Sequence, residues 1–258
     1  MIFDTHAHYD DKSFDEDRDE LLQSMRGKNI QTIVNVGASL EGSRRSVLLA
    51  NKYEHVYAAV GVHPDDAGEI NASSLDELKQ LALNNPKVVA IGEIGLDYHW
   101  DVHDRNIQKE AFANQIALAC ELDLPINIHS RDAALDTMDL LKSATLPNKG
   151  GIMHCFSYSP EIAKEVLSLG LSIGIGGVCT FSNAKKLKEV VANTPLDRIV
   201  IETDCPYLAP TPHRGSRNSS LYLPLVIEQI AVLKGLSVEE VENQTYKNAC
   251  RIYNLPQA

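Results

Sequence analysis

The sequence predicts an α/β protein, and within that class a (β/α)8 TIM barrel with an additional C-terminal helix. Eight short runs rich in Val and Ile alternate with longer amphipathic runs along the 258 residues. This alternation is typical of parallel strands that are covered by helices on the outside. A doubly wound open sheet is the alternative, but the segment HAHYDD after the first run is not the glycine-rich phosphate loop of that fold. We therefore treat residues 1–258 as one domain.

The expected strands are the apolar runs at residues 2–6, 32–36, 56–62, 88–94, 125–129, 151–154, 171–176 and 198–202. Amphipathic patterns between them predict helices at residues 15–27, 39–53, 74–84, 104–122, 131–143, 160–169, 184–192 and 221–233. Ser73 or Ser74 is the expected N-cap of the third helix. A final helix is expected over residues 238–251, because Ser237 and Glu240 have the spacing of a capping box.

Composition limits the possible functions. Hydrophobic residues make up 44% of the chain, enough for a folded core, and the net charge is −11. Proteins that wrap nucleic acid are usually basic, so a polyanionic substrate would have to be held by metal ions and a few local arginines. The five cysteines contain no Cys-x-x-Cys pair, which indicates reduced thiols in a cytoplasmic protein. No apolar run approaches the roughly 18 residues that span a bilayer, and we expect no signal peptide.

Histidines and carboxylates follow the apolar runs repeatedly. In a barrel of this kind the catalytic groups lie at the carboxyl ends of the strands. The residues expected there are His6, His8, His63, Glu93, Asp97, His129, His154 and Asp204. Side chains alternate along a strand, so Asp4, His6 and His8 should share one face. A mixture of imidazole and carboxylate ligands at one edge of a barrel predicts a site for divalent metal ions.

Six metal ligands are more than one ion with an open position requires, and we therefore predict two ions. Two histidine pairs each hold one ion; these pairs are His6 with His8 and His129 with His154. Glu93, on the fourth strand, is placed to bridge the two ions. Asp204 follows the eighth strand, which neighbours the first, and so it is assigned to the first ion.

The chain resembles the TatD family of metal-dependent deoxyribonucleases, a branch of the amidohydrolase superfamily. The resemblance covers nearly the whole length and rests on the segments FDTHAHYD, GVHP, IGEIGLDY, PINIHSRDA, MHCFS, IETDCPYLAP and HRGSRNSSLYLP. It implies that the metal ligands are His6, His8, Glu93, His129, His154 and Asp204. It also implies that the loop carrying Arg214, Arg217 and Asn218 contacts substrate.

These residues favour a divalent-metal-dependent hydrolase that uses Mg, Mn or Zn to activate a water molecule. The expected reaction is cleavage of DNA phosphodiester bonds, by an exonucleolytic route. Asp204 and Glu93 are the expected catalytic residues, and Asp204 can accept a proton as well as ligate a metal ion. His63 and Arg131 are expected to hold phosphate oxygens. The aromatic segment at residues 98–100 could stack bases or simply pack.

Other functions stay open on the sequence alone. An ester or amide hydrolase of the same superfamily, such as a D-aminoacyl-tRNA deacylase, would use the same ions. A phosphatase of the histidinol-phosphatase type also begins with a His-x-His strand, and a non-catalytic binding module is a third class. We expect a cytoplasmic monomer whose partner is its DNA substrate, with no membrane association.

Overall fold

The computed structural model describes residues 1–257, and it contains an eight-stranded, parallel, nearly closed barrel. The strands are β1 (Ile2–Ala7), β2 (Ile30–Val36), β3 (Val56–Val60), β4 (Val88–Asp97), β5 (Ile126–Arg131), β6 (Gly151–Met153), β7 (Ser172–Ile175) and β8 (Ile199–Ile201). They follow one another around the barrel in chain order, and each pairs in parallel with the next. The predicted fold class is therefore confirmed.

The barrel closes where β8 meets β1, just beyond the regular part of both strands. Ala7 forms a parallel bridge with Cys205, and the N–H of His8 donates to the carbonyl of Cys205 at 2.9 Å. The N–H of Asp204 donates to the carbonyl of His6, also at 2.9 Å. The backbone that closes the barrel thus carries three of the six predicted metal ligands, and closure holds them together.

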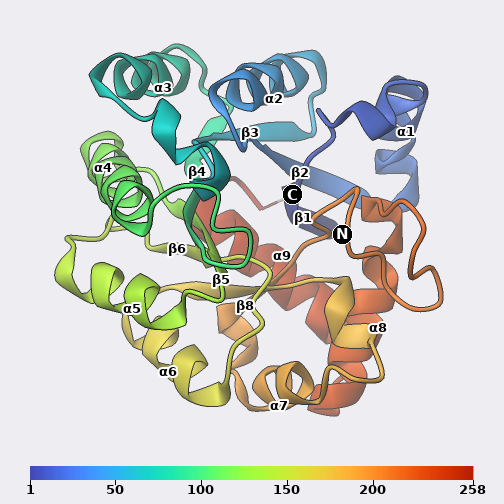
Figure 1. Cartoon of the computed structure of the whole chain (residues 1–258). Coiled ribbons are helices and arrows are strands. Elements are labelled where there is room, and N and C mark those ends of the chain that lie inside the picture. Colours follow the sequence, from blue (N-terminus) through green and yellow to red (C-terminus); the bar gives the residue numbers. More distant parts are fainter. Residues whose placement is uncertain (258) are drawn as a thin grey trace.

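Nine α-helices lie on and below the barrel in the described part of the chain. They are α1 (Arg18–Ser24), α2 (Leu40–Lys52), α3 (Ala72–Asn84), α4 (Arg105–Leu122), α5 (Ala134–Ser143), α6 (Pro160–Ser168), α7 (Lys185–Asn193), α8 (Leu223–Lys234) and α9 (Val238–Tyr253). Short 3-10 helices are η1 (Lys12–Phe14), η2 (Arg26–Lys28), η3 (Pro64–Glu69), η4 (Gly177–Thr180), η5 (Leu196–Arg198) and η6 (Ser220–Tyr222). Figure 1 shows the helices around the strands, with α9 (red) lying across the middle of the ring.

Some boundaries differ from the expected ones. Helix α3 begins two residues early because Asn71, not a serine, is its N-cap: the Asn71 side chain accepts the N–H groups of Ser73 and Ser74. Ser74 completes the capping box. Strand β4 runs to Asp97 because its ladder with β5 continues to Arg131. The capping box predicted for the last helix is present at the start of α9.

Helix α9 packs against the strands from within the barrel's lower part. Phe3 of β1 stacks on Tyr253 with ring centroids 5.6 Å apart. The Tyr253 hydroxyl donates to the Thr5 carbonyl and to Asn127 Oδ1, each at 3.0 Å. These contacts join α9 to β1 and β5. Thr5 and Asn127 come just before His6 and His129 in the sequence. The additional C-terminal helix therefore forms a floor beneath the strand ends that carry the polar residues.

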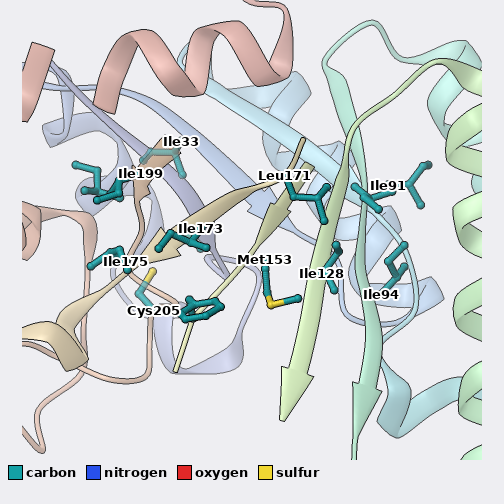
Figure 2. Close-up of a cluster of buried hydrophobic side chains, with 14 of the residues drawn as sticks. Ile33, Ile91, Ile94, Ile128, Met153, Leu171, Ile173, Ile175, Ile199 and Cys205 are labelled. Atoms are coloured by element: carbon teal, nitrogen blue, oxygen red, sulfur yellow. The ribbon is translucent and has the colours of Figure 1, made fainter. Parts of the chain in front are cut away.

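The remaining core is mainly aliphatic, with Phe14, Phe112 and Phe156 among its buried aromatic side chains, and part of it lies along neighbouring strands. Figure 2 shows part of it, with Ile128, Met153 and Ile173 from β5, β6 and β7 side by side. Among residues 1–257 no single helix is long and apolar enough to cross a membrane. One bent helix pair, Ser220–Lys234 with Val238–Tyr253, meets that criterion by length and composition only when the two are combined.

Candidate metal centre

All six predicted ligands meet at the carboxyl ends of the strands. They come from five positions around the barrel: the end of β1, β4, β5, and the segments directly after β6 and β8.

The site depends on close contact between β4 and β5, and Gly95 permits it. Gly95 has φ +154°, and a Cβ there would lie 1.9 Å from the carbonyl oxygen of His129. Glycine at this position allows Glu93 and His129 to face each other.

Glu93 lies between the two histidine pairs. Its Oε2 is 3.5 Å from His6 Nε2 and 3.6 Å from His8 Nε2. Its Oε1 is 2.8 Å from His129 Nδ1 and 2.8 Å from His154 Nε2. The side chain is 5% exposed, so each oxygen of one buried carboxylate is directed at a different pair of imidazoles.

In each histidine pair, two imidazole nitrogens face each other at a short distance. Two protonated nitrogens would repel each other at this separation. His6 Nε2 and His8 Nε2 are 3.1 Å apart, and His129 Nδ1 and His154 Nε2 are 3.2 Å apart. Asp204 Oδ1 lies 3.4 Å from His8 Nε2, on the side of the first pair. Imidazole nitrogens and carboxylate oxygens in this arrangement fit divalent transition-metal ions such as Zn or Mn. The residues present therefore suit a metal centre.

The charges around the site favour carboxylates that stay ionised. Burial raises the pKa of Glu93, but nearby His154 and His6 and the hydrogen bonds from His129 and His154 lower it well below its usual value. Burial likewise raises the pKa of Asp204, and the hydrogen bond from His8, with the other histidines, lowers it overall. Both carboxylates are anionic near neutral pH and can hold cations.

In the metal-free protein, protons on histidine balance these carboxylates. Burial lowers the pKa of His8, but its hydrogen bond to Asp204 and the nearby acids raise it to about 10. For His129, burial is outweighed by Asp97 and Glu93, and the pKa rises to about 9. A protonated imidazole cannot ligate a metal ion through the same nitrogen.

Metal binding should therefore release protons at pH 7, since His8 and His129 must become neutral before they ligate. We expect roughly two protons per chain and an affinity that strengthens as the pH rises toward 9. Calorimetric titration with Mn or Zn in two buffers of different ionisation enthalpy measures this release. Identical apparent enthalpies in both buffers would contradict the assignment of these histidines as ligands.

Groups outside the cluster orient the imidazole rings of the predicted ligands. His8 Nδ1 lies 2.8 Å from the carbonyl of Val36, so this nitrogen donates and Nε2 is left to face the site. His129 Nε2 lies 2.9 Å from Asp97 Oδ2. Asp97 also accepts the N–H groups of His99 and Trp100. Asp97 was expected at the end of the fourth strand, but no role was predicted for it; an even spacing of four residues puts it on the same face of β4 as Glu93.

Glu202 is a second acid that the site-residue prediction left out. Its side chain is buried, and the N–H of Cys155 donates to its Oε1. That same oxygen lies 3.7 Å from His154 Nδ1. Burial is the main reason that the pKa of Glu202 is raised to about 8. Gly174 makes room for it, because a Cβ there would lie 2.1 Å from Glu202 Oε2.

Asp4 does not share the face of His6 and His8, and the expectation that it does was wrong. The β1–β2 register is irregular between Asp4 and Ala7, which breaks the simple alternation. Asp4 instead accepts hydrogen bonds from the Thr203 hydroxyl at 2.7 Å and the Ser220 hydroxyl at 2.6 Å. It joins β1 to the segments after β8 and before α8.

A pocket of about 760 Å³ opens above the ligands. His63 lines it, and its Nδ1 accepts the N–H of Asp65 at 3.1 Å. Burial, together with the nearby His129, lowers the pKa of His63 to about 3, so the ring is neutral. Its Nε2 therefore carries the hydrogen and lies 3.9 Å from Glu93 Oε1, with the capacity to donate to a bound ligand.

Of the four other residues predicted to bind substrate, only Arg131 lines this pocket. Its guanidinium lies over the Trp100 ring at 5.6 Å, and among residues 1–257 no carboxylate oxygen comes within 4 Å of it. Arg214 instead lies over the Phe181 ring at 4.4 Å, outside the pocket lining. Its side chain would have to move to reach a substrate there.

The structure also does not bring Arg217 or Asn218 into the pocket. Arg217 is paired with Asp17 and donates to the Ser13 carbonyl at 2.7 Å, which fastens its loop to the segment before α1. Asn218 is 1% exposed, and its amide donates to the carbonyls of Thr203 and Tyr207, each at 2.8 Å. The polar groups of both residues are used within the protein. They therefore stabilise the loop that follows Asp204 and do not face the pocket.

Comparison with known proteins places the whole chain in one group. The family model described as TatD related DNase matches residues 3–254. A Bacillus subtilis protein named Uncharacterized metal-dependent hydrolase YabD is 46% identical over 255 residues, which cover 99% of this chain and 100% of the relative. A Cronobacter sakazakii protein named 3'-5' ssDNA/RNA exonuclease TatD is 35% identical over 258 residues, covering 98% and 97%. The crystal structure of YjjV, a TatD homologue from Escherichia coli K12, matches with a TM-score of 0.93 and 32% identity, covering 99% of this chain and 98% of that one.

Proposed function

The chain belongs to the TatD-related DNase family and is a metal-dependent hydrolase, and on this premise we propose that it removes nucleotides from the end of single-stranded DNA using two divalent ions. The observation that carries the proposal is Glu93, whose two oxygens face two separate histidine pairs. One pair with Asp204 would hold the first ion, and the other pair would hold the second. Mg, Mn and Zn are the candidate metals.

Bound divalent ions would acidify a water molecule and neutralise charge on the phosphoryl oxygens. The protein supplies the groups around that chemistry. Asp204, ionised and partly buried beside His8, is the group we assign to accept the proton of the attacking water. His63 Nε2–H and the Arg131 guanidinium are placed to hold non-bridging phosphate oxygens. Glu93 and the histidines keep the reacting groups in position.

A panel of substrates and metals tests the proposal. The metal-free protein is supplied in turn with Mg, Mn and Zn and offered single-stranded DNA, RNA, a D-aminoacyl-tRNA and a small lactone. We expect metal-dependent release of mononucleotides from DNA. Preferred turnover of the aminoacyl ester or the lactone, with DNA left intact, would instead assign the chain to the ester and amide hydrolases.

Arg131→Ala should raise the KM for single-stranded DNA about tenfold and change kcat by less than about threefold, because a hydrogen bond to a charged group contributes about 1.5–3 kcal/mol. Arg217→Ala is the matched control: its exposed pair with Asp17 contributes little, so KM should change by less than about twofold. Steady-state kinetics on both variants measures this. A larger KM effect for Arg217 than for Arg131 would restore the substrate-binding role first expected of Arg217.

The proposal includes a monomer that works in the cytoplasm. All five cysteines are free thiols, and three of them are buried, which supports a reducing compartment. Light scattering of the purified protein and fractionation of cells test these two points.

A further inference from the structure

A second cavity of about 560 Å³ adjoins the metal pocket. Arg131 and Ser157 line both cavities, so they form the boundary between them. The other lining residues come from the segments after β4, β5 and β6 and from helices α6 and α7; they are His99, Asp132, Tyr158, Ser159, Ile162 and Lys186. A chain-like ligand seated at the metal centre can therefore continue past Arg131 into this second space.

Charge differs between the two sides of the metal pocket. The loops after β1 and β3 place Asp10, Asp11 and Asp65 in its lining. Arg131, at the end of β5, and Lys186, on α7, lie on the half of the barrel opposite those strands. Within residues 1–257, no carboxylate oxygen lies within 4 Å of Lys186 Nζ. In the described part of the chain the one acid lining the second cavity, Asp132, lies 3.2 Å from His99 Nδ1. A polyanion is thus attracted by Arg131 and Lys186 on one side and repelled by three acids on the other.

An exposed aromatic ring stands at the start of the basic side. Trp100 lines the metal pocket and is 63% exposed, and the Arg131 guanidinium and the His99 ring lie 5.6 Å and 5.0 Å from it. Its backbone is held, because its N–H donates to Asp97 Oδ1 at 2.9 Å. A fixed, solvent-exposed aromatic beside an arginine is suited to stacking an unpaired base.

We propose that the substrate strand leaves the metal centre in one direction only, past Trp100 and Arg131 into the second cavity, where Lys186 contacts a phosphate beyond the bond being cleaved. This inference rests on the proposed function and deepens it. The acidic side formed by Asp10, Asp11 and Asp65 leaves room for a strand end but opposes a continuing polyanion. Terminal cleavage of single strands follows from this one-sided path.

The test compares Lys186→Ala with Lys185→Ala, a change of the neighbouring exposed lysine that does not line the cavity. Trp100 is the only tryptophan in the chain, so its fluorescence reports stacking directly. Phosphorothioate oligothymidylates of two and eight nucleotides are titrated in the presence of Mg, and cleavage of linear and circular single-stranded DNA is measured alongside.

The octamer should quench the fluorescence. Lys186→Ala should weaken octamer binding about three- to tenfold, leave the dinucleotide within about twofold, and reduce the salt slope by roughly 0.7. Lys185→Ala should match the parent, and circular DNA should be cut at least about 100-fold more slowly than linear DNA, since the acidic side repels a continuing strand.

Three results would overturn the path while leaving the nuclease activity standing: no quenching by the octamer, an equal or absent effect of Lys186→Ala on both lengths, or equal cleavage of circular and linear DNA. Failure of the parent protein to cleave linear DNA with any of the three metals would overturn the proposed function itself, and the path with it.

Discussion

Glu93→Ala should remove at least one of two bound divalent ions and lower turnover by at least about 10²–10³-fold, the scale of losing one preorganised electrostatic group. The reason is geometric. Oε2 faces the His6 and His8 nitrogens, and Oε1 faces those of His129 and His154, at 2.8–3.6 Å. No second carboxylate in the described residues contacts both pairs in this way, so the loss cannot be compensated.

Metal content measured by mass spectrometry, together with kcat on single-stranded DNA, checks this expectation. Glu93→Gln keeps the side-chain volume while removing the charge, so it separates ligation from packing. Asp66→Asn is the control: it removes an acid from η3, on the same face of the barrel, that lines neither cavity, and it should keep both ions. A Glu93→Ala protein with two ions and near-parental turnover would disprove the bridging role.

Asp204→Asn should lower turnover by about 10²–10⁴-fold, the usual effect of losing a general base, with the fold preserved. The Asp204 carboxylate is anionic because hydrogen bonding from His8 and the nearby histidines outweigh its burial. An amide oxygen in the same place can still lie near the first ion, but it cannot take a proton from water. No apolar core contact changes, so the thermal unfolding temperature with metal present should stay close to that of the parent.

The measurement is single-turnover cleavage of single-stranded DNA over a range of pH, with metal content determined on the same samples. Asp204 is ionised throughout the neutral range, and metal binding already depends on pH through His8 and His129, so parent and variant should show pH profiles of similar shape. The variant rate should lie about 10²–10⁴-fold below the parent rate across that range. Turnover within a few-fold of the parent, with both ions in place, would make Asp204 a ligand only.

The strand ends that carry His6, Glu93, His129 and Asp204 could be predicted from the sequence for a local reason. Each follows a short apolar run, and in a parallel barrel the carboxyl ends of all strands meet at one edge. Helix caps could be predicted for the same local reason. The capping box of α9 depends only on Ser237 and Glu240, which are three residues apart. Where a competing local cap was present, at Asn71, the expected start of α3 was two residues late.

Local patterns could not show which of the residues predicted to bind substrate line the pocket. The position of each side chain depends on contacts between segments that are distant in the sequence. Arg217 is paired with Asp17, about two hundred residues earlier, and this pairing turns it away from the pocket. Strand alternation predicted that Asp4 shares a face with His6 and His8, but the irregular register of β1 directs it to Thr203 and Ser220. Periodicity cannot reveal such a break, since it is set by the neighbouring strand.

The barrel, the additional helix and the gathering of six predicted ligands, as two histidine pairs around one carboxylate, could all be predicted from the sequence alone. The reason is that each feature follows from a short pattern repeated along the chain. In a parallel barrel, such a pattern at each strand end places its residues at one edge. Which polar side chains remain free to meet a substrate depends instead on the folded protein. In the described part of the chain Arg131 has no carboxylate partner and lines both cavities, whereas Arg217 and Asn218 have donors used within the protein. Whether a polar side chain is free to bind substrate depends on every group that packs against it. Those neighbours come from distant parts of the sequence and meet only in the folded protein.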